Sequence, residues 1–198
     1  MTDHFFEKKS IGLLILAGGR SKRMGRDKSS LEIGGKSFAG HIADAMGNFD
    51  EKLISYNKPY CDPGEMPEGF VKVPDEEDIR GKGPAAGIAT ALRECRSRWL
   101  MVVPCDVPMI DRQTAMNLWN ALDNRDVIVT ARGSRGTEPL IGIYPKKCWP
   151  LIRQMVLSGI YVMREILEHI GYETVSIDDE KLININTPTE YEEKIAKK

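Results

Sequence analysis

Short apolar runs alternate with helical stretches along most of this 198-residue chain, and this alternation limits the folds open to it. Apolar runs of four to six residues bounded by turn residues are typical of buried strands. They lie at 11–16, 52–55, 70–73, 99–103 and 126–130, with helical stretches at 38–46, 84–95 and 111–122. A chain that alternates in this way favours an α/β fold with a mainly parallel sheet and right-handed crossovers.

The pattern changes after residue 138. A strand at 139–144 precedes two helices, at 146–155 and 162–169, and then a short strand at 174–177. Thr187, Pro188 and Glu190 form a capping-box pattern, which predicts that a final helix begins there. Because no repeat, long linker or charge block divides the chain, we expect a single domain over residues 1–198.

Composition excludes several classes of partner and compartment. The net charge is -1, with 28 basic and 29 acidic residues, so neither nucleic acid nor an anionic membrane is favoured as a partner. The four cysteines lie far apart without a C-x-x-C pair, which argues against a metal or redox site and predicts reduced thiols. No apolar stretch approaches the roughly 20 residues that span a bilayer, and the N-terminus lacks a signal-peptide core. A cytoplasmic protein is therefore expected.

A glycine-rich, basic segment follows the first strand. It reads Leu16-Ala-Gly-Gly-Arg-Ser-Lys-Arg-Met-Gly-Arg-Asp-Lys28, and five of the nine residues at 20–28 are basic. Open α/β sheets bind ligands beyond the carboxyl ends of their strands. Gly18 and Gly19 allow close approach of backbone N–H groups to phosphate oxygens, and Arg23 and Lys28 can neutralise a triphosphate. A solvated basic turn is the alternative for such a segment.

Two familiar nucleotide motifs are absent. A P-loop requires G-x-x-x-x-G-K-[ST], and Lys28 lies only three residues after Gly25. The dinucleotide fingerprint G-x-G-x-x-G is missing as well. The segment therefore predicts a phosphate loop of another kind.

A candidate metal ligand follows the most apolar central strand. The strand at 99–103 continues into Pro104-Cys-Asp-Val-Pro108 and places Asp106 at its carboxyl end. A carboxylate in that position faces the ligand crevice, and its hard oxygen suits Mg²⁺. The alternative is a turn aspartate that only caps local backbone groups.

The loop Leu-Ala-Gly-Gly-x-x-x-Arg-Met-Gly-x-Asp-Lys resembles the signature of the molybdenum cofactor guanylyltransferases. Related cytidylyltransferases more typically read Leu-Ala-Ala-Gly and end on Pro-Lys, whereas this chain has Gly18-Gly19 and Asp27-Lys28. The resemblance implies a Rossmann-like, three-layer nucleotidyltransferase fold. It also implies transfer of GMP from GTP to the terminal phosphate of molybdopterin, with release of pyrophosphate. Transient contact with cofactor-delivery proteins or molybdoenzymes would follow.

The resemblance also assigns residues to roles. It implies that Arg23, Lys28 and Asp106 are catalytic and that Asp106 binds Mg²⁺. The nucleotide would be held by Leu16, Ala17, Gly18, Gly19, Lys28, Asn57, Asp75 and Asp106. Asn184 and Asn186, in an Asn-x-Asn-Thr-Pro motif, would lie at the periphery of the active site, on the acceptor side. Residues 11–110 would then form the nucleotide-binding half and residues 111–198 the acceptor-side half.

Departures and alternatives are visible in the same sequence. The family usually has Gly-Pro-Leu-Ala-Gly where this chain has Gly83-Pro-Ala-Ala-Gly87. A cytidylyltransferase or sugar-phosphate nucleotidyltransferase of the same fold is the alternative enzyme, and an idle nucleotide-binding protein is a more distant one.

The three histidines lie apart, which suits a reaction whose nucleophile is a phosphate that needs no protein base.

Overall fold

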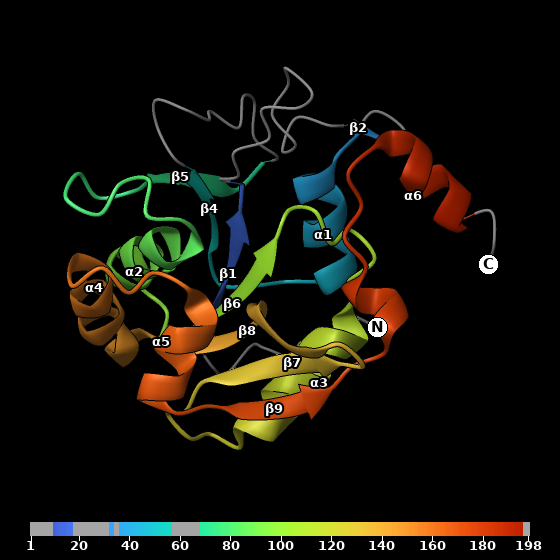
Figure 1. The fold of residues 1–198 in the computed structure, drawn as a ribbon. Helices are drawn as coiled ribbons and strands as arrows, with labels where there is room; N and C mark the ends of the chain where they lie inside the picture. The colour runs from blue at the N-terminus through green and yellow to red at the C-terminus, as the bar shows by residue number, and fades with distance from the viewer. Residues whose placement is uncertain (1–9, 18–31, 34–35, 57–67, 196–198) are drawn as a thin grey trace.

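The computed structural model describes residues 10–17, 32–33, 36–56 and 68–195 (Figure 1). In these residues a seven-stranded sheet has the order β5-β4-β1-β6-β8-β7-β9. Its strands are β1 (Ile11–Leu16), β4 (Lys52–Tyr56), β5 (Phe70–Pro74), β6 (Trp99–Pro104), β7 (Val129–Gly133), β8 (Gly136–Pro145) and β9 (Glu173–Ser176). A separate two-stranded sheet, β2 (Glu32–Ile33) with β3 (Lys36–Ser37), has no counterpart among the strands expected from the sequence.

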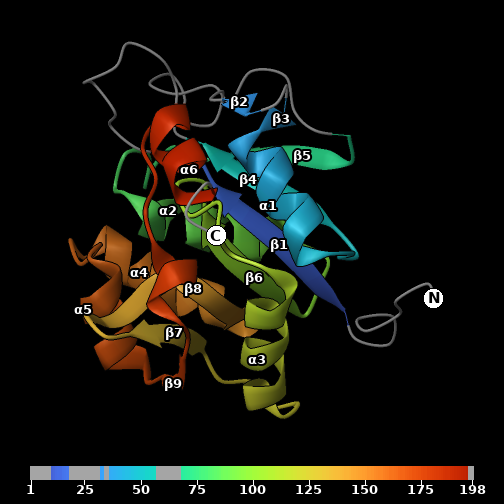
Figure 2. The ribbon, with the colours of Figure 1, turned by 90° about the vertical axis from the view of Figure 1, so that its right-hand side faces the viewer.

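Helices cover both faces of the sheet (Figures 1 and 2). One face carries α1 (Phe38–Met46) and α3 (Arg112–Leu122), and the other carries α2 (Pro84–Glu94), α4 (Trp149–Leu157) and α5 (Met163–Ile170). Near the C-terminus are the 3₁₀ turn η3 (Asp179–Leu182) and α6 (Pro188–Ile195). The predicted three-layer α/β fold is confirmed. The helix expected from residue 146 begins as a 3₁₀ turn, η2 (Lys146–Cys148), before α4.

The central strands are apolar on both sides because each side faces a helical layer. Along β1, Leu13 and Ile15 belong to the core under α1 and α3, whereas Leu14 and Leu16 belong to the core under α2. All four side chains are buried. Burying a side chain of this size contributes about 1.5–3 kcal/mol, so an unbroken apolar run specifies a central strand.

The sheet is mainly parallel, as predicted, with one strand reversed. Strands β5, β4, β1 and β6 run parallel, as do β7 and β9, whereas β8 pairs antiparallel with both β6 and β7. The reversal brings the first residues of β8 to the edge where β1 and β6 end. That edge is therefore formed by residues distant in sequence.

The pairing of β7 with β8 shifts register next to this edge. Thr130 is opposite Gly142, but its neighbour Ala131 is opposite Glu138, so the three residues at 139–141 have no partner on β7. Pro139 is compatible with this place because it has no N–H to offer a ladder. The hydroxyl of the fully buried Tyr144 donates a hydrogen bond to the carbonyl of Pro139.

Asp111 begins α3, as the sequence predicts. Its carboxylate accepts from the N–H and the hydroxyl of Thr114, both at 3.0 Å, and from Lys181 at 2.7 Å. Burial opposes ionisation here, but the hydrogen bonds from Lys181 and Thr114 hold the pKa of Asp111 below its ordinary value. The ion pair between Lys181 and Asp111 therefore joins η3 to the start of α3.

The sequence predicts reduced cysteines and has no apolar stretch long enough to span a bilayer. Cys95 and Cys148 are free thiols in the structure, Cys105 is buried, and Cys61 lies outside the described residues. Over the described ranges, none of the helices combines the length and the apolar character needed to cross a membrane.

Candidate active site

A pocket of about 350 Å³ lies where β1 and β6 end and β8 begins. Its walls come from five separate parts of the chain. They are Leu16, Ala17, Pro84, Pro104, Cys105, Asp106, Val107, Glu138, Pro139, Leu140, Ile141 and Asn184. Four predicted site residues, Leu16, Ala17, Asp106 and Asn184, thus line one pocket.

Main-chain hydrogen bonds place Asp106 at this pocket. Leu16 and Pro104 are opposite each other at the ends of β1 and β6. The chain then turns, with Cys105 N–H bonded to Leu16 O at 3.1 Å and Val107 N–H to Pro104 O at 3.3 Å. Asp106, which is half-buried, therefore lies in a tight turn held on both sides and lines the pocket.

Glu138 is a pocket residue to which the sequence alone assigns no individual role, although the segment 137–144 resembles the family segment near the acceptor site. It is half-buried near the start of β8 and lines the same pocket as Asp106. The sequence predicted a strand from Pro139 but not its direction. Because β8 is antiparallel to β6, its first residues rather than its last reach the catalytic edge.

The oxygen donors in this pocket suit a magnesium ion shared with a substrate. Asp106 and Glu138 supply carboxylates and Asn184 supplies an amide. Mg²⁺ in nucleotide sites is commonly held by one or two carboxylates together with substrate phosphates and water. Within the described ranges no group of three or more His, Cys, Asp or Glu is placed to hold a metal ion. The donor set therefore fits an ion completed by phosphate oxygens, and not a cage made of protein alone.

Asp75 lies outside the walls of this pocket. It follows β5, and its side chain is buried under α2, where the Ser55 hydroxyl donates to it at 3.5 Å and the Gly81 N–H also bonds to it. Burial raises the pKa of Asp75 to about 6, although the bonds from Gly81 and Ser55 and the charge of Arg80 act in the opposite direction. Its proposed contact with nucleotide stays a prediction.

Gly87 explains how α2 approaches Asp75 so closely. A Cβ at this position would overlap the Ser55 hydroxyl, lie 3.2 Å from the Ser55 Cβ and lie 3.5 Å from Asp75 Oδ1. The first turns of α2 can rest on the ends of β4 and β5 because residue 87 has no side chain.

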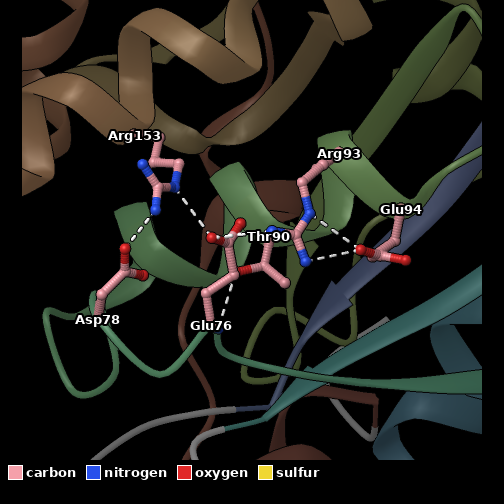
Figure 3. A network of polar contacts seen from close by, with 6 residues as sticks. All are labelled: Glu76, Asp78, Thr90, Arg93, Glu94 and Arg153. Atoms are coloured by element: carbon pink, nitrogen blue, oxygen red, sulfur yellow. Dashed lines mark hydrogen bonds and ion pairs between the residues drawn. The ribbon is translucent and has the colours of Figure 1, made fainter.

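A polar cluster fixes the segment between β5 and α2 (Figure 3). The carboxylate of Glu76, whose side chain is 7% exposed, accepts from Arg93 at 3.0 Å and from Arg153 at 2.9 Å. Its N–H bonds to Thr90 Oγ1 at 3.2 Å, and Arg153 also pairs with Asp78. One oxygen of Glu76, Oε1, is buried and has no hydrogen-bond partner among the described residues. The cluster joins this segment to α2 and α4.

The predicted Asn-x-Asn-Thr-Pro motif divides between the pocket and a helix cap. Asn184 lines the pocket, whereas Asn186 lies at the start of α6, outside the pocket walls. Thr187 caps α6 by accepting from the Glu190 N–H at 3.2 Å, as predicted. The Glu190 carboxylate accepts from the N–H of Asn186 at 2.7 Å, one residue before the position that a capping box uses.

The remaining predicted residues lie outside the described part of the chain. They are Gly18, Gly19, Arg23, Lys28 and Asn57. Their roles stay predictions. The segment that contains the first four of them follows Ala17, which lines the pocket.

The sequence as a whole matches a known family. A family model described as MobA-like NTP transferase domain matches residues 13–175, most of the chain. The chain belongs to this family. It is therefore a nucleotidyltransferase, and the resemblance seen in its loop motif is confirmed. The matched residues of the MobA-like domain include Leu16, Asp75, Asp106 and Glu138.

Relatives of the MobA-like domain support the same placement. The chain is 32% identical over 181 residues to the molybdenum cofactor guanylyltransferase of Pseudomonas syringae, covering 89% of each protein. Among solved structures, molybdopterin-guanine dinucleotide biosynthesis protein A from Archaeoglobus fulgidus has a TM-score of 0.70 at 20% identity, over 94% of this chain and 100% of that one. The 2-C-methyl-D-erythritol 4-phosphate cytidylyltransferase of Thermus thermophilus has a TM-score of 0.69 at 14% identity, over 95% and 98%. Both structures show a shared fold.

Proposed function

We propose that this nucleotidyltransferase transfers GMP from GTP to the terminal phosphate of molybdopterin, forming molybdopterin guanine dinucleotide and releasing pyrophosphate. The observation that carries the proposal is the pocket in which Asp106, Glu138 and Asn184 meet the end of β1. A relative at 32% identity is named for this activity. The part of the chain that matches the MobA-like family model, residues 13–175, includes the pocket's two carboxylates.

The chemistry suits the side chains of the pocket. An oxygen of the acceptor phosphate attacks the α-phosphorus of GTP, the bond to the β-phosphate breaks, and pyrophosphate leaves with the bonding electrons. A phosphate monoester has a second pKa of about 6, so it is ionised at neutral pH without a protein base. None of the described pocket residues is a histidine, in keeping with such a nucleophile.

Positioning and charge then carry the catalysis. Asp106 and Glu138 would hold Mg²⁺ against the phosphates, with the Asn184 amide beside them. The bound ion supplies positive charge that offsets the repulsion between two anionic substrates. We assign Gly18, Gly19, Arg23 and Lys28 to the phosphates of GTP and Asn57 and Asp75 to its nucleoside, as proposals from the sequence motif.

A cytidylyltransferase is the second candidate, because the Thermus thermophilus enzyme of that class shares the fold over 95% of this chain. The two candidates differ only in the base and acceptor that they accept. The test is to incubate the purified protein with molybdopterin, Mg²⁺ and one of GTP, CTP, ATP or UTP. Products are identified by mass spectrometry.

The expected product is the guanine dinucleotide, formed with GTP alone. A cytosine dinucleotide would keep the mechanism and overturn the choice of base. Folded protein that forms no dinucleotide with any of the four nucleotides would overturn molybdopterin as the acceptor.

A further inference from the structure

A second, larger cavity adjoins the Asp106 pocket. Its volume is about 780 Å³, within the range of roughly 300–1,000 Å³ in which small molecules bind. Pro84, Pro139 and Leu140 line both spaces. A molecule with one end beside Asp106 can therefore extend past these three residues into the larger cavity.

The walls of this cavity come from three elements. Residues 81–84 lead into α2, residues 139–140 belong to the stretch of β8 that has no partner on β7, and residues 161–164 lead into α5. Arg164 Nη2 donates to the carbonyl of Thr137 at 3.3 Å, which ties the start of α5 to β8. The cavity thus lies between elements of the fold, two of which are bonded to each other, and it adjoins the candidate active site.

The side chains at its surface suit a flat ring with polar edges. Tyr161 is 44% exposed and Val162 is 51% exposed, an unusual position for two large apolar side chains side by side. The Lys82 Nζ lies 5.7 Å from the centroid of the Tyr161 ring. An exposed aromatic ring next to a cation offers stacking and charge to the same ligand.

Most of the cavity lies on the acceptor side of the sheet. Asp75, assigned to the nucleoside, follows β5 on the far side of β1 from β8, and it meets the cavity only at the wall formed by residues 81–84, where the Gly81 N–H bonds to it. Two of the three cavity walls, β8 and the start of α5, come from the half of the chain that we assign to the acceptor. The acceptor's phosphate must reach the Asp106 pocket, and its ring then has the adjoining cavity open to it.

We propose that this cavity binds the ring system of the acceptor, with Tyr161 stacked on the planar pyrimidinone ring of the pterin and Lys82 bonded to its polar edge. The proposal rests on molybdopterin being the acceptor. It makes Tyr161 and Lys82 determinants of acceptor binding, while the nucleotide is bound elsewhere.

Steady-state kinetics with Tyr161→Ala and Lys82→Ala test the proposal. Each change raises the KM for molybdopterin by about tenfold, since contacts of this kind are worth about that factor, and leaves the KM for GTP unchanged. Tyr161→Phe retains the ring and the wild-type KM. Leu157→Ala and Lys147→Ala are matched controls, because both residues are exposed and neither lines the cavity.

Two kinetic outcomes would overturn the proposal. A raised KM for GTP with an unchanged KM for molybdopterin would place the nucleotide in the cavity. Wild-type values of both constants in the two alanine variants would leave the cavity without a role in substrate binding. Melting temperatures of all variants establish that each one is folded.

Titration calorimetry with molybdopterin, in the absence of GTP, separates this proposal from the proposed function. If the wild type forms no dinucleotide but binds molybdopterin, and Tyr161→Ala weakens that binding about tenfold, the cavity assignment stands and the reaction is wrong. Binding that is equal in the wild type and in Tyr161→Ala overturns the cavity assignment, whatever the reaction. A wild-type protein that neither binds nor converts molybdopterin overturns both.

Discussion

The N–H of Ile185 donates a hydrogen bond to the carbonyl of Asp106, with an N···O distance of 2.7 Å. Ile185 itself is 1% exposed, so the segment after η3 is anchored both by its main chain and by its side chain. This anchor explains why Asn184, from the end of the chain, lines a pocket formed by the ends of β1 and β6.

The anchor can be tested by shortening Ile185. We expect Ile185→Val to lower the free energy of unfolding by about 0.5–1.5 kcal/mol and Ile185→Ala to lower it by about 2–5 kcal/mol. At a temperature where Ile185→Ala remains folded, turnover should fall further than the folded fraction does, because Asn184 loses its position. Urea unfolding and dinucleotide formation measure the two effects. Full turnover in a folded Ile185→Ala protein would show that the anchor is dispensable.

The carboxylates of the pocket should matter for turnover and little for folding. We expect Asp106→Asn to lower kcat by about a hundredfold or more, as removal of a preorganised electrostatic contact does. Glu138→Gln should shift the Mg²⁺ titration of activity to higher concentrations. Glu77→Gln is the control, an exposed carboxylate outside the pocket. Unchanged magnesium dependence in both pocket variants would remove them from the metal site.

Asp75 gives a pH-dependent prediction with opposite effects on stability and activity. Its folded-state pKa, about 6, lies above the ordinary 3.8, so the folded protein binds this proton more tightly than the unfolded chain does. The resulting stability is present in full below about pH 4 and is lost as the pH rises through 6. Asp75→Asn removes the cost of burying the charge and should stabilise the protein at pH 7.5, by up to about 3 kcal/mol.

The measurement is the difference in free energy of unfolding between wild type and Asp75→Asn, taken from pH 4 to pH 7.5. We expect a difference near zero at pH 4 that grows with pH, together with weaker GTP binding at pH 7.5. A constant difference across this range would mean that Asp75 titrates normally. Stabilisation without any loss of GTP binding would contradict its assignment to the nucleoside.

The cluster around Glu76 should act on the stability of the segment that leads into α2. Glu76→Ala removes both arginine contacts of a buried carboxylate and should cost about 1–3 kcal/mol. Glu77→Ala, at the exposed neighbouring position, should change stability by less than about 0.5 kcal/mol. Urea unfolding compares the two variants. If Glu76→Ala and Glu77→Ala lower stability equally, the buried ion pairs of Glu76 stabilise the protein no more than an exposed charge does.

The fold could be predicted largely from the sequence because burial on two faces leaves a clear pattern. The unbroken apolar run of β6 could only be a central strand, and Asp111 marked the start of α3 by its capping chemistry. The direction of β8 was not predictable in the same way. The apolar pattern of a strand is the same in either chain direction. The pattern therefore does not show whether the strand pairs parallel or antiparallel with its neighbours in the sheet.

The candidate site was predictable where a residue type and its place in the sheet agree. Asp106 follows a buried strand, and its position at the carboxyl edge follows from the parallel order. Glu138, Lys82 and Tyr161 gave no comparable signal, because their proximity depends on the reversed strand and on the packing of α2 and α5. Asn186 shows the converse, since a motif residue can lie at a helix cap instead of in the pocket.

The shift of register between Thr130 and Ala131 has a consequence for how such enzymes diverge. Pro139 and Leu140 line both pockets while making no ladder bonds to β7. Substitutions there can reshape the surface that meets a substrate without moving the strands on either side. Selection for a new acceptor, in nature or in a directed library, would find its least constrained positions in this short stretch of β8.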